Sequence, residues 1–149
     1  MVDPKTGMEY RYLGNSGVSV SRFAYGNWLS SGDEKDYKLT RDVIQRCFEH
    51  GVNFFDTAEA YGFGQAEATM GKAIKELGLK RENIVVSTKI FRAGPNVNDL
   101  LLSRKHIIEG TNNALKRLQM DYVDIIFCHR PDYNAPLEET CRAMSWLIE

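Results

Sequence analysis

The fold of this chain is decided by a five-residue run, Ile-Val-Val-Ser-Thr over residues 84–88, and by the two patterns that flank it. The run is apolar and rich in β-branched residues, as strands covered on both faces are. Before it, residues 66–77 repeat apolar side chains at helical spacing and stop at Gly78. After it, the helical pattern over 103–118 begins at Ser103, a residue type that caps helix N-termini. A buried strand between two amphipathic helices is the repeating unit of α/β proteins.

The same alternation extends in both directions along the chain. Short apolar strands are predicted over 23–25, 52–55 and 123–127, and helices over 39–50 and from 136 to the end. The order is therefore β-α-β-α-β-α-β-α, which right-handed crossovers build into a parallel sheet covered by helices. The periodicity alone leaves two architectures open, a doubly wound sheet and part of a (β/α)8 barrel.

One feature counts against the doubly wound sheet. The dinucleotide fingerprint G-x-G-x-x-G does not follow the first strand, because Gly26 is succeeded by Asn27 and Trp28. Residues 10–13 and 18–20 flank the turn Gly-Asn-Ser-Gly and predict a β-hairpin ahead of the alternating units. A complete barrel needs about 250 residues. The 149 residues therefore cannot close a complete barrel alone.

Charge and composition exclude several classes of function. Lys and Arg number 19 against 20 Asp and Glu, so the chain lacks the basic surplus of a nucleic-acid binder or a membrane-surface module. No apolar stretch is long enough for membrane insertion, and the first residues have no signal-peptide core. We expect a single soluble domain over residues 1–149.

The cysteines favour a cytoplasmic location, and the histidines do not predict a metal site. The three cysteines are odd in number, have no C-x-x-C spacing and predict no disulfide. We therefore expect a cytoplasmic location, with Cys128 as a small core residue of its strand. The three histidines stand on different predicted elements without ligand spacing, so no metal site is expected.

Four titratable side chains follow the predicted strands at the edge where parallel sheets bind ligands. Asp56 ends the second strand, Tyr61 lies in the loop beyond it, Lys89 follows the third strand and His129 follows the fourth. Taken singly, each has an ordinary structural explanation. Their convergence on one edge favours a catalytic site.

The chemistry that this set allows is proton donation to a carbonyl oxygen. A free phenol has a pKa near ~10 and is a weak acid at neutral pH, but a nearby ammonium favours the phenolate. Lys89 can supply that charge beside Tyr61, and Asp56 can hold Lys89 by an ion pair. His129 can donate a hydrogen bond to the substrate oxygen. None of these groups is a hydride source, so a reduction requires a nicotinamide cofactor.

Three motifs around these residues resemble the aldo-keto reductase family. They are Asn-Phe-Phe-Asp-Thr-Ala-Glu-Ala-Tyr-Gly over 53–62, Ser-Thr-Lys over 87–89 and Ile-Phe-Cys-His-Arg-Pro over 126–131. Within the family, the chain is most similar to the voltage-gated potassium channel β-subunit branch. The segments that carry this second resemblance are 10–17, 103–110, 118–124 and 130–132.

The resemblance implies a fold and a set of roles. The family fold is a (β/α)8 barrel whose N-terminal end is closed by a hairpin. Tyr61 would be the general acid, Lys89 the residue that modulates its acidity, Asp56 the partner of Lys89 and His129 the group that orients the carbonyl. The implied cofactor is NADP(H), and the implied substrate is a small aldehyde or ketone.

The resemblance also implies cofactor contacts. Asn27 and Trp28, together with Asp56 and His129, match positions that line the nicotinamide end. Asn27 stands where the family usually has threonine. The later units, which supply the pyrophosphate clamp and the residues that read the 2′-phosphate, lie outside this chain.

Three interpretations remain open. The first is an NADP(H)-dependent reductase represented by its catalytic half. The second is an auxiliary subunit that binds the cytoplasmic domain of a potassium channel; channel β-subunits commonly carry Asn where this chain has His129, which favours catalysis. The third is a truncated, inactive product. Unpaired sheet edges predict marginal stability as a monomer and leave a homo-oligomer open.

Overall fold

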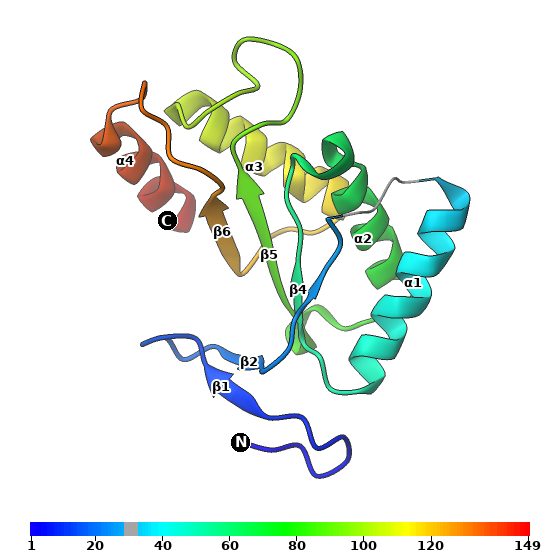
Figure 1. The fold of residues 1–149 in the computed structure, drawn as a ribbon. Coiled ribbons are helices and arrows are strands. Elements are labelled where there is room, and N and C mark those ends of the chain that lie inside the picture. The colour runs from blue at the N-terminus through cyan, green and yellow to red at the C-terminus, as the bar shows by residue number, and fades with distance from the viewer. Residues whose placement is uncertain (29–32) are drawn as a thin grey trace.

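The computed structural model describes residues 1–28 and 33–149. Its strands are β1 (Tyr10–Tyr12), β2 (Ser19–Ser21), β3 (Tyr25–Gly26), β4 (Phe54–Asp56), β5 (Val85–Ile90) and β6 (Ile125–Cys128). Its α-helices are α1 (Glu34–Glu49), α2 (Gln65–Glu76), α3 (Arg104–Leu118) and α4 (Leu137–Ile148), with short 3-10 helices η1 (Tyr61–Gly64) and η2 (Arg81–Asn83). Figure 1 shows the four helices following strands β3 to β6 in turn.

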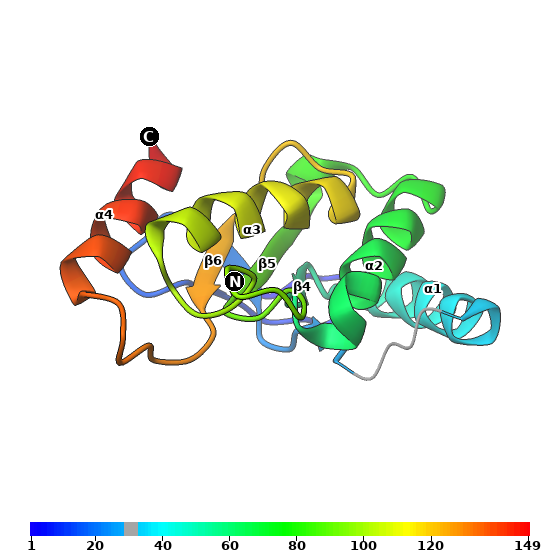
Figure 2. The same cartoon turned by 90° about the horizontal axis from the view of Figure 1, so that it is seen from above.

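Strands β3, β4, β5 and β6 form one parallel sheet in that order. Helices α1, α2, α3 and α4 lie side by side along one side of the sheet in Figure 2. Consecutive strands are neighbours and each is followed by a helix, so the predicted succession of four β/α units is confirmed. Register brings Asp56 opposite Ser87 and Lys89 opposite Phe127, which places their side chains on the same face of the sheet.

The main core lies between the sheet and the first three helices. Phe55 and Val86 from the strands meet Ile44, Met70 and Leu118 from the helices, and all five are fully buried. Helices α2 and α3 approach so closely that a methyl group on Gly71 of α2 would lie 2.2 Å from the backbone oxygen of Leu118. A glycine is therefore required at this helix contact.

The predicted hairpin is present and is attached to the N-terminal ends of the strands (Figure 1). Asn53, just before β4, accepts a hydrogen bond from the backbone of Ser21 at 2.7 Å and donates one to the carbonyl of Ser19 at 3.1 Å. The Tyr10 hydroxyl donates to the carbonyl of Gly51 at 2.7 Å. The hairpin thus covers the end of the sheet opposite the predicted site.

The structure corrects three details of the sequence analysis. Helix α1 begins at Glu34 rather than at residue 39, because the Asp33 side chain accepts a hydrogen bond from the backbone of Asp36 and caps a first turn that has little apolar periodicity. Strand β5 continues to Ile90, so Lys89 lies within the strand. Cys128 is exposed rather than a core residue, since it is the last residue of β6, whose final two residues are both exposed.

Within residues 1–28 and 33–149, none of the helices combines the length and apolar character that crossing a bilayer requires.

Candidate functional site

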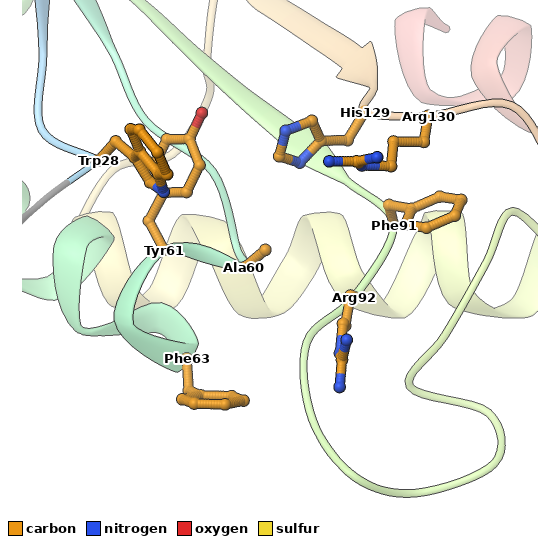
Figure 3. A pocket seen from close by; sticks show the side chains of 8 residues that line it. All are labelled: Trp28, Ala60, Tyr61, Phe63, Phe91, Arg92, His129 and Arg130. Carbon is orange, nitrogen blue, oxygen red and sulfur yellow. The ribbon is translucent and has the colours of Figure 1, made fainter.

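A cavity of about 780 Å³ opens at the carboxyl ends of the parallel strands. Figure 3 shows the eight side chains that line it: Trp28, Ala60, Tyr61, Phe63, Phe91, Arg92, His129 and Arg130. They come from the segments that follow β3, β4, β5 and β6. The cavity therefore lies where ligands bind in parallel α/β proteins.

Lys89 and Asp56 form an ion pair close to Tyr61, one of the residues that line this cavity. Lys89 Nζ lies 2.5 Å from Asp56 Oδ2 and donates a second hydrogen bond to the carbonyl of Thr57 at 2.7 Å. The other carboxylate oxygen, Asp56 Oδ1, accepts a hydrogen bond from Ser87 Oγ at 2.6 Å. The side chains of Lys89 and Asp56 are only 16% and 29% exposed, so the charges are partly withdrawn from water. The ammonium is held in one position by two acceptors.

Tyr61 lies within reach of this ammonium. Lys89 Nζ is 4.9 Å from the centre of the Tyr61 ring. The His129 ring stands edge-on to the phenol, with 5.7 Å between centroids, and the Trp28 ring is 6.5 Å away on another side. The structure therefore brings together the acid, phenol, amine and imidazole that the sequence analysis placed at one edge.

The electrostatic setting of His129 favours its neutral form. Burial lowers the pKa of the His129 imidazole below its ordinary value, and the positive charges of Lys89 and Arg130 lower it further. The backbone N–H of His129 donates to the carbonyl of Ile90 at 3.0 Å, which fixes the residue directly after β6. A neutral imidazole still carries one N–H that can donate to a ligand oxygen.

The loop that carries Tyr61 is anchored by a buried carboxylate that the sequence analysis missed. Glu59 is fully buried, and its Oε1 accepts a hydrogen bond from the backbone of Phe91 at 2.6 Å. The same oxygen lies 2.9 Å from His106 Nε2 on α3. The available signal was an acidic residue inside the short segment between Asp56 and Tyr61. Glu59 thus ties the Tyr61 loop to the end of β5 and to α3.

A second buried ion pair lies deeper beneath the site. Glu67 of α2 is fully buried, accepts a hydrogen bond from Thr88 Oγ1 at 2.5 Å and pairs with Arg117 Nε at 2.6 Å. Burial raises the pKa of the Glu67 carboxyl even though both partners favour its charged form. This pair connects α2, α3 and β5 behind the residues that face the cavity.

Asn27 and Trp28 are placed differently from each other. Asn27 is buried, and its side-chain amide donates to the carbonyl of Ala66 at the start of α2 at 2.6 Å. Its amide oxygen is buried without a hydrogen-bond partner in the described part of the chain. Trp28 is exposed and lines the cavity. Contact of either residue with a cofactor stays a prediction.

A second cavity, of about 530 Å³, lies on the inner face of the sheet. Asp56, Lys89 and His129 border it together with the apolar side chains of Phe54 and Phe127. His129 lines both cavities, so the two meet at the reactive cluster. No group of three or more His, Cys, Asp or Glu side chains among residues 1–28 and 33–149 is placed to hold a metal ion.

Comparison with known proteins identifies a family and several relatives. The model of the aldo/keto reductase family matches residues 22–149. Probable voltage-gated potassium channel β-subunits from Arabidopsis thaliana and from rice (Oryza sativa subsp. japonica) are 55% and 52% identical over 142 residues, which is 95% of this chain. A putative β-subunit from Schizosaccharomyces pombe is 50% identical over 143 residues, or 94% of the chain.

A solved structure has the same fold. The holo form of an aldo-keto reductase from Bacillus halodurans superposes with a TM-score of 0.81 and 31% identity, covering 94% of this chain and 46% of that one. This chain spans 43% of the length of the two plant relatives and 42% of the fission yeast one. The four β/α units therefore correspond to about half of a (β/α)8 barrel.

Proposed function

This chain belongs to the aldo/keto reductase family, and on that premise we propose that it carries the proton-transfer half of an NADP(H)-dependent reductase of aldehydes and ketones. The observation that supports the proposal most directly is the ion pair of Lys89 and Asp56 beside the Tyr61 ring. An amine held by a carboxylate next to a phenol is the arrangement that proton donation by the phenol requires.

The roles of the four residues follow from their contacts. Lys89 stabilises the negative charge that Tyr61 acquires when it gives its hydroxyl proton to the substrate oxygen. Asp56 and the Thr57 carbonyl hold the ammonium in place. His129, kept neutral by burial and by two neighbouring cations, donates a hydrogen bond to the same oxygen and orients the carbonyl.

The residues present fit the reactive end of a nicotinamide cofactor. None of the side chains around the cavity can donate a hydride, whereas proton donors for a carbonyl are concentrated there. Bound NADPH would supply the hydride. Trp28 and His129, with Asn27 and Asp56 next to them, are the residues of this chain that we expect to contact it. Preference for NADPH over NADH is part of the proposal.

The proposal is tested by one substitution with a matched control. We expect Tyr61→Phe to lower kcat for NADPH-dependent reduction of a panel of aldehydes by about 10²–10⁴-fold, the usual contribution of a general acid. Tyr12→Phe, on the exposed hairpin strand β1, should leave kcat unchanged. Binding of NADPH is followed in parallel by fluorescence. Bound NADPH without turnover in the unsubstituted chain, or equal turnover in Tyr61→Phe, would contradict the proposal.

A second candidate function is association with a potassium channel. We propose it because the plant relatives, which are 55% and 52% identical to this chain, are named as probable channel β-subunits. The expected result is co-purification with the cytoplasmic domain of a voltage-gated potassium channel. Tyr61→Phe should retain that binding while losing turnover. This outcome separates the two functions, and failure to co-purify counts against the channel alone.

We propose a cytoplasmic location for either function. The three cysteines are unpaired in the structure, which suits a reducing compartment. The uncovered edges of β3 and β6 leave room for pairing with another chain, which includes a second copy. Sedimentation of the 149-residue chain tests that association: a compact monomer contradicts it.

A further inference from the structure

Two arginines border the cavity that contains Tyr61 and His129. They are Arg92, just after β5, and Arg130, just after His129. Neither has an ion pair or hydrogen bond from its guanidinium to any residue in the described ranges 1–28 and 33–149. The residues that line this cavity include no carboxylate. The cavity therefore carries positive charge that the surrounding chain does not neutralise.

Two arginines outside the cavity have carboxylate partners. Arg81 lies 2.6 Å from Asp124, and Arg117 lies 2.6 Å from Glu67. A guanidinium presents a rigid fork of donors that matches the two oxygens of a carboxylate. Arg92 and Arg130 keep that capacity free at the mouth of the candidate site.

The positions of the two groups span the cavity. Figure 3 shows the Arg130 guanidinium extending toward His129, whereas Arg92 extends to the side of the cavity where Phe63 lies. The electrostatic influence of Arg130 on the His129 imidazole agrees with that proximity. Phe91 lies between the two arginines in Figure 3, and the rings of Trp28 and Phe63 provide further apolar walls.

We propose that this cavity selects carbonyl compounds that also carry a carboxylate. The inference rests on the proposed reductase function and names its substrate class. The carbonyl would lie at Tyr61 and His129, the apolar body would contact the aromatic walls, and the guanidinium groups of Arg92 and Arg130 would attract the carboxylate from two sides of the cavity. A neutral substrate leaves both guanidinium groups without an anionic partner, which is why the acid is preferred.

A pair of product-like ligands tests this selection without requiring turnover. Calorimetric titration of the full 149-residue chain compares 4-(hydroxymethyl)benzoate with its neutral methyl ester. Both are alcohols, so neither reacts with lysine amines as an aldehyde would. We expect the carboxylate to bind at least about tenfold more tightly than the ester at low ionic strength. Added salt should weaken that preference, since both guanidinium groups are reached by solvent.

Substitutions of the two arginines test whether their charges cause the preference for the carboxylate. Arg92→Met and Arg130→Met should each reduce the preference severalfold, and the double variant should bind acid and ester within about twofold of each other. Arg46→Met, on an arginine of α1 that is 75% exposed, is the matched control and should bind like the unsubstituted chain.

The outcomes separate this inference from the proposed function. Equal binding of acid and ester, binding of neither, or a preference that survives in the double variant overturns the inference. Tyr61→Phe should keep the preference, because the hydroxyl that it removes is not the group that binds the carboxylate. A chain that prefers the carboxylate and yet fails to reduce 4-carboxybenzaldehyde with NADPH contradicts the proposed function alone.

Discussion

The two faces of the β3–β6 sheet differ in how they are covered. On the face toward the helices, Phe55 and Val86 are fully buried in a cluster with side chains of α1, α2 and α3. On the inner face, Phe127 is 44% exposed and shares a cavity of about 530 Å³ with Lys89 and His129. The face toward the helices forms the hydrophobic core, and the inner face carries the candidate site.

Charged groups follow the same division. The pairs behind the sheet, Glu67 with Arg117 and Glu59 with His106, include carboxylates that are fully buried. The pair at the site, Lys89 with Asp56, keeps part of both side chains exposed. A buried pair fixes the positions of helices and loops, whereas a partly exposed ammonium remains close enough to the cavity to act on Tyr61. The difference shows that position relative to the sheet, more than residue type, decides what a charge does here.

The largest expected effect comes from truncating one aromatic residue on each face. Phe55→Ala removes a fully buried ring and should lower the free energy of unfolding by about 3–5 kcal/mol. Phe127→Ala removes a ring that already contacts water and should cost much less, about 1 kcal/mol. Urea denaturation of both variants measures the difference. Equal losses would show that the inner face is as well packed in solution as the helix-covered face.

The next effect comes from breaking the buried pair of Glu67 and Arg117. Arg117→Met leaves the Glu67 carboxylate buried with Thr88 as its remaining partner, and should cost about 3 kcal/mol near neutral pH. The cost should shrink in acid. Because the pKa of Glu67 is raised, this carboxyl takes up its proton in the folded state at a higher pH than in the unfolded state, and a protonated carboxyl no longer needs Arg117.

Urea denaturation of Arg117→Met at two pH values checks this sign. The neighbouring Lys116→Met, on an exposed position of α3, is the control and should change stability little at either pH. A loss from Arg117→Met that is the same at both pH values would mean that the Glu67 carboxylate is not the group left unpaired.

The sequence was sufficient for the succession of strands and helices because the relevant signals are local, whereas the choice of a barrel over a doubly wound sheet depended on the family resemblance. Apolar spacing over residues 84–88 and its flanks depends on near neighbours, and strand–helix alternation admits few topologies. The site residues were also accessible to sequence reasoning, since Asp56, Lys89 and His129 stand at strand ends that a parallel sheet gathers at one edge.

The two buried pairs behind the site, Glu59 with His106 and Glu67 with Arg117, could not be predicted from the sequence. Glu59 and His106 are 47 positions apart, and Glu67 and Arg117 are 50 positions apart. In the sequence each looks like a solvated charge on a loop or helix. Only the packing of α2 and α3 on the sheet shows that these charges are buried together. The exposure of Cys128 was missed because an apolar strand sequence does not reveal how far along the strand the covering helices extend.

The smallest expected effect is a change in the pKa of His129, whose imidazole borders the cavity on the inner face. Burial, Lys89 and Arg130 lower the pKa of His129, and Arg130→Met removes one of these causes. The NMR titration of the His129 ring should therefore shift toward the ordinary value near ~6.5 in this variant. Between the lowered pKa and ~6.5 the unfolded chain binds more protons than the folded chain, so stability rises with pH across that window. Arg130→Met should narrow this pH range, because it brings the pKa of folded His129 closer to the unfolded value. An unchanged titration would assign the shift to burial and Lys89.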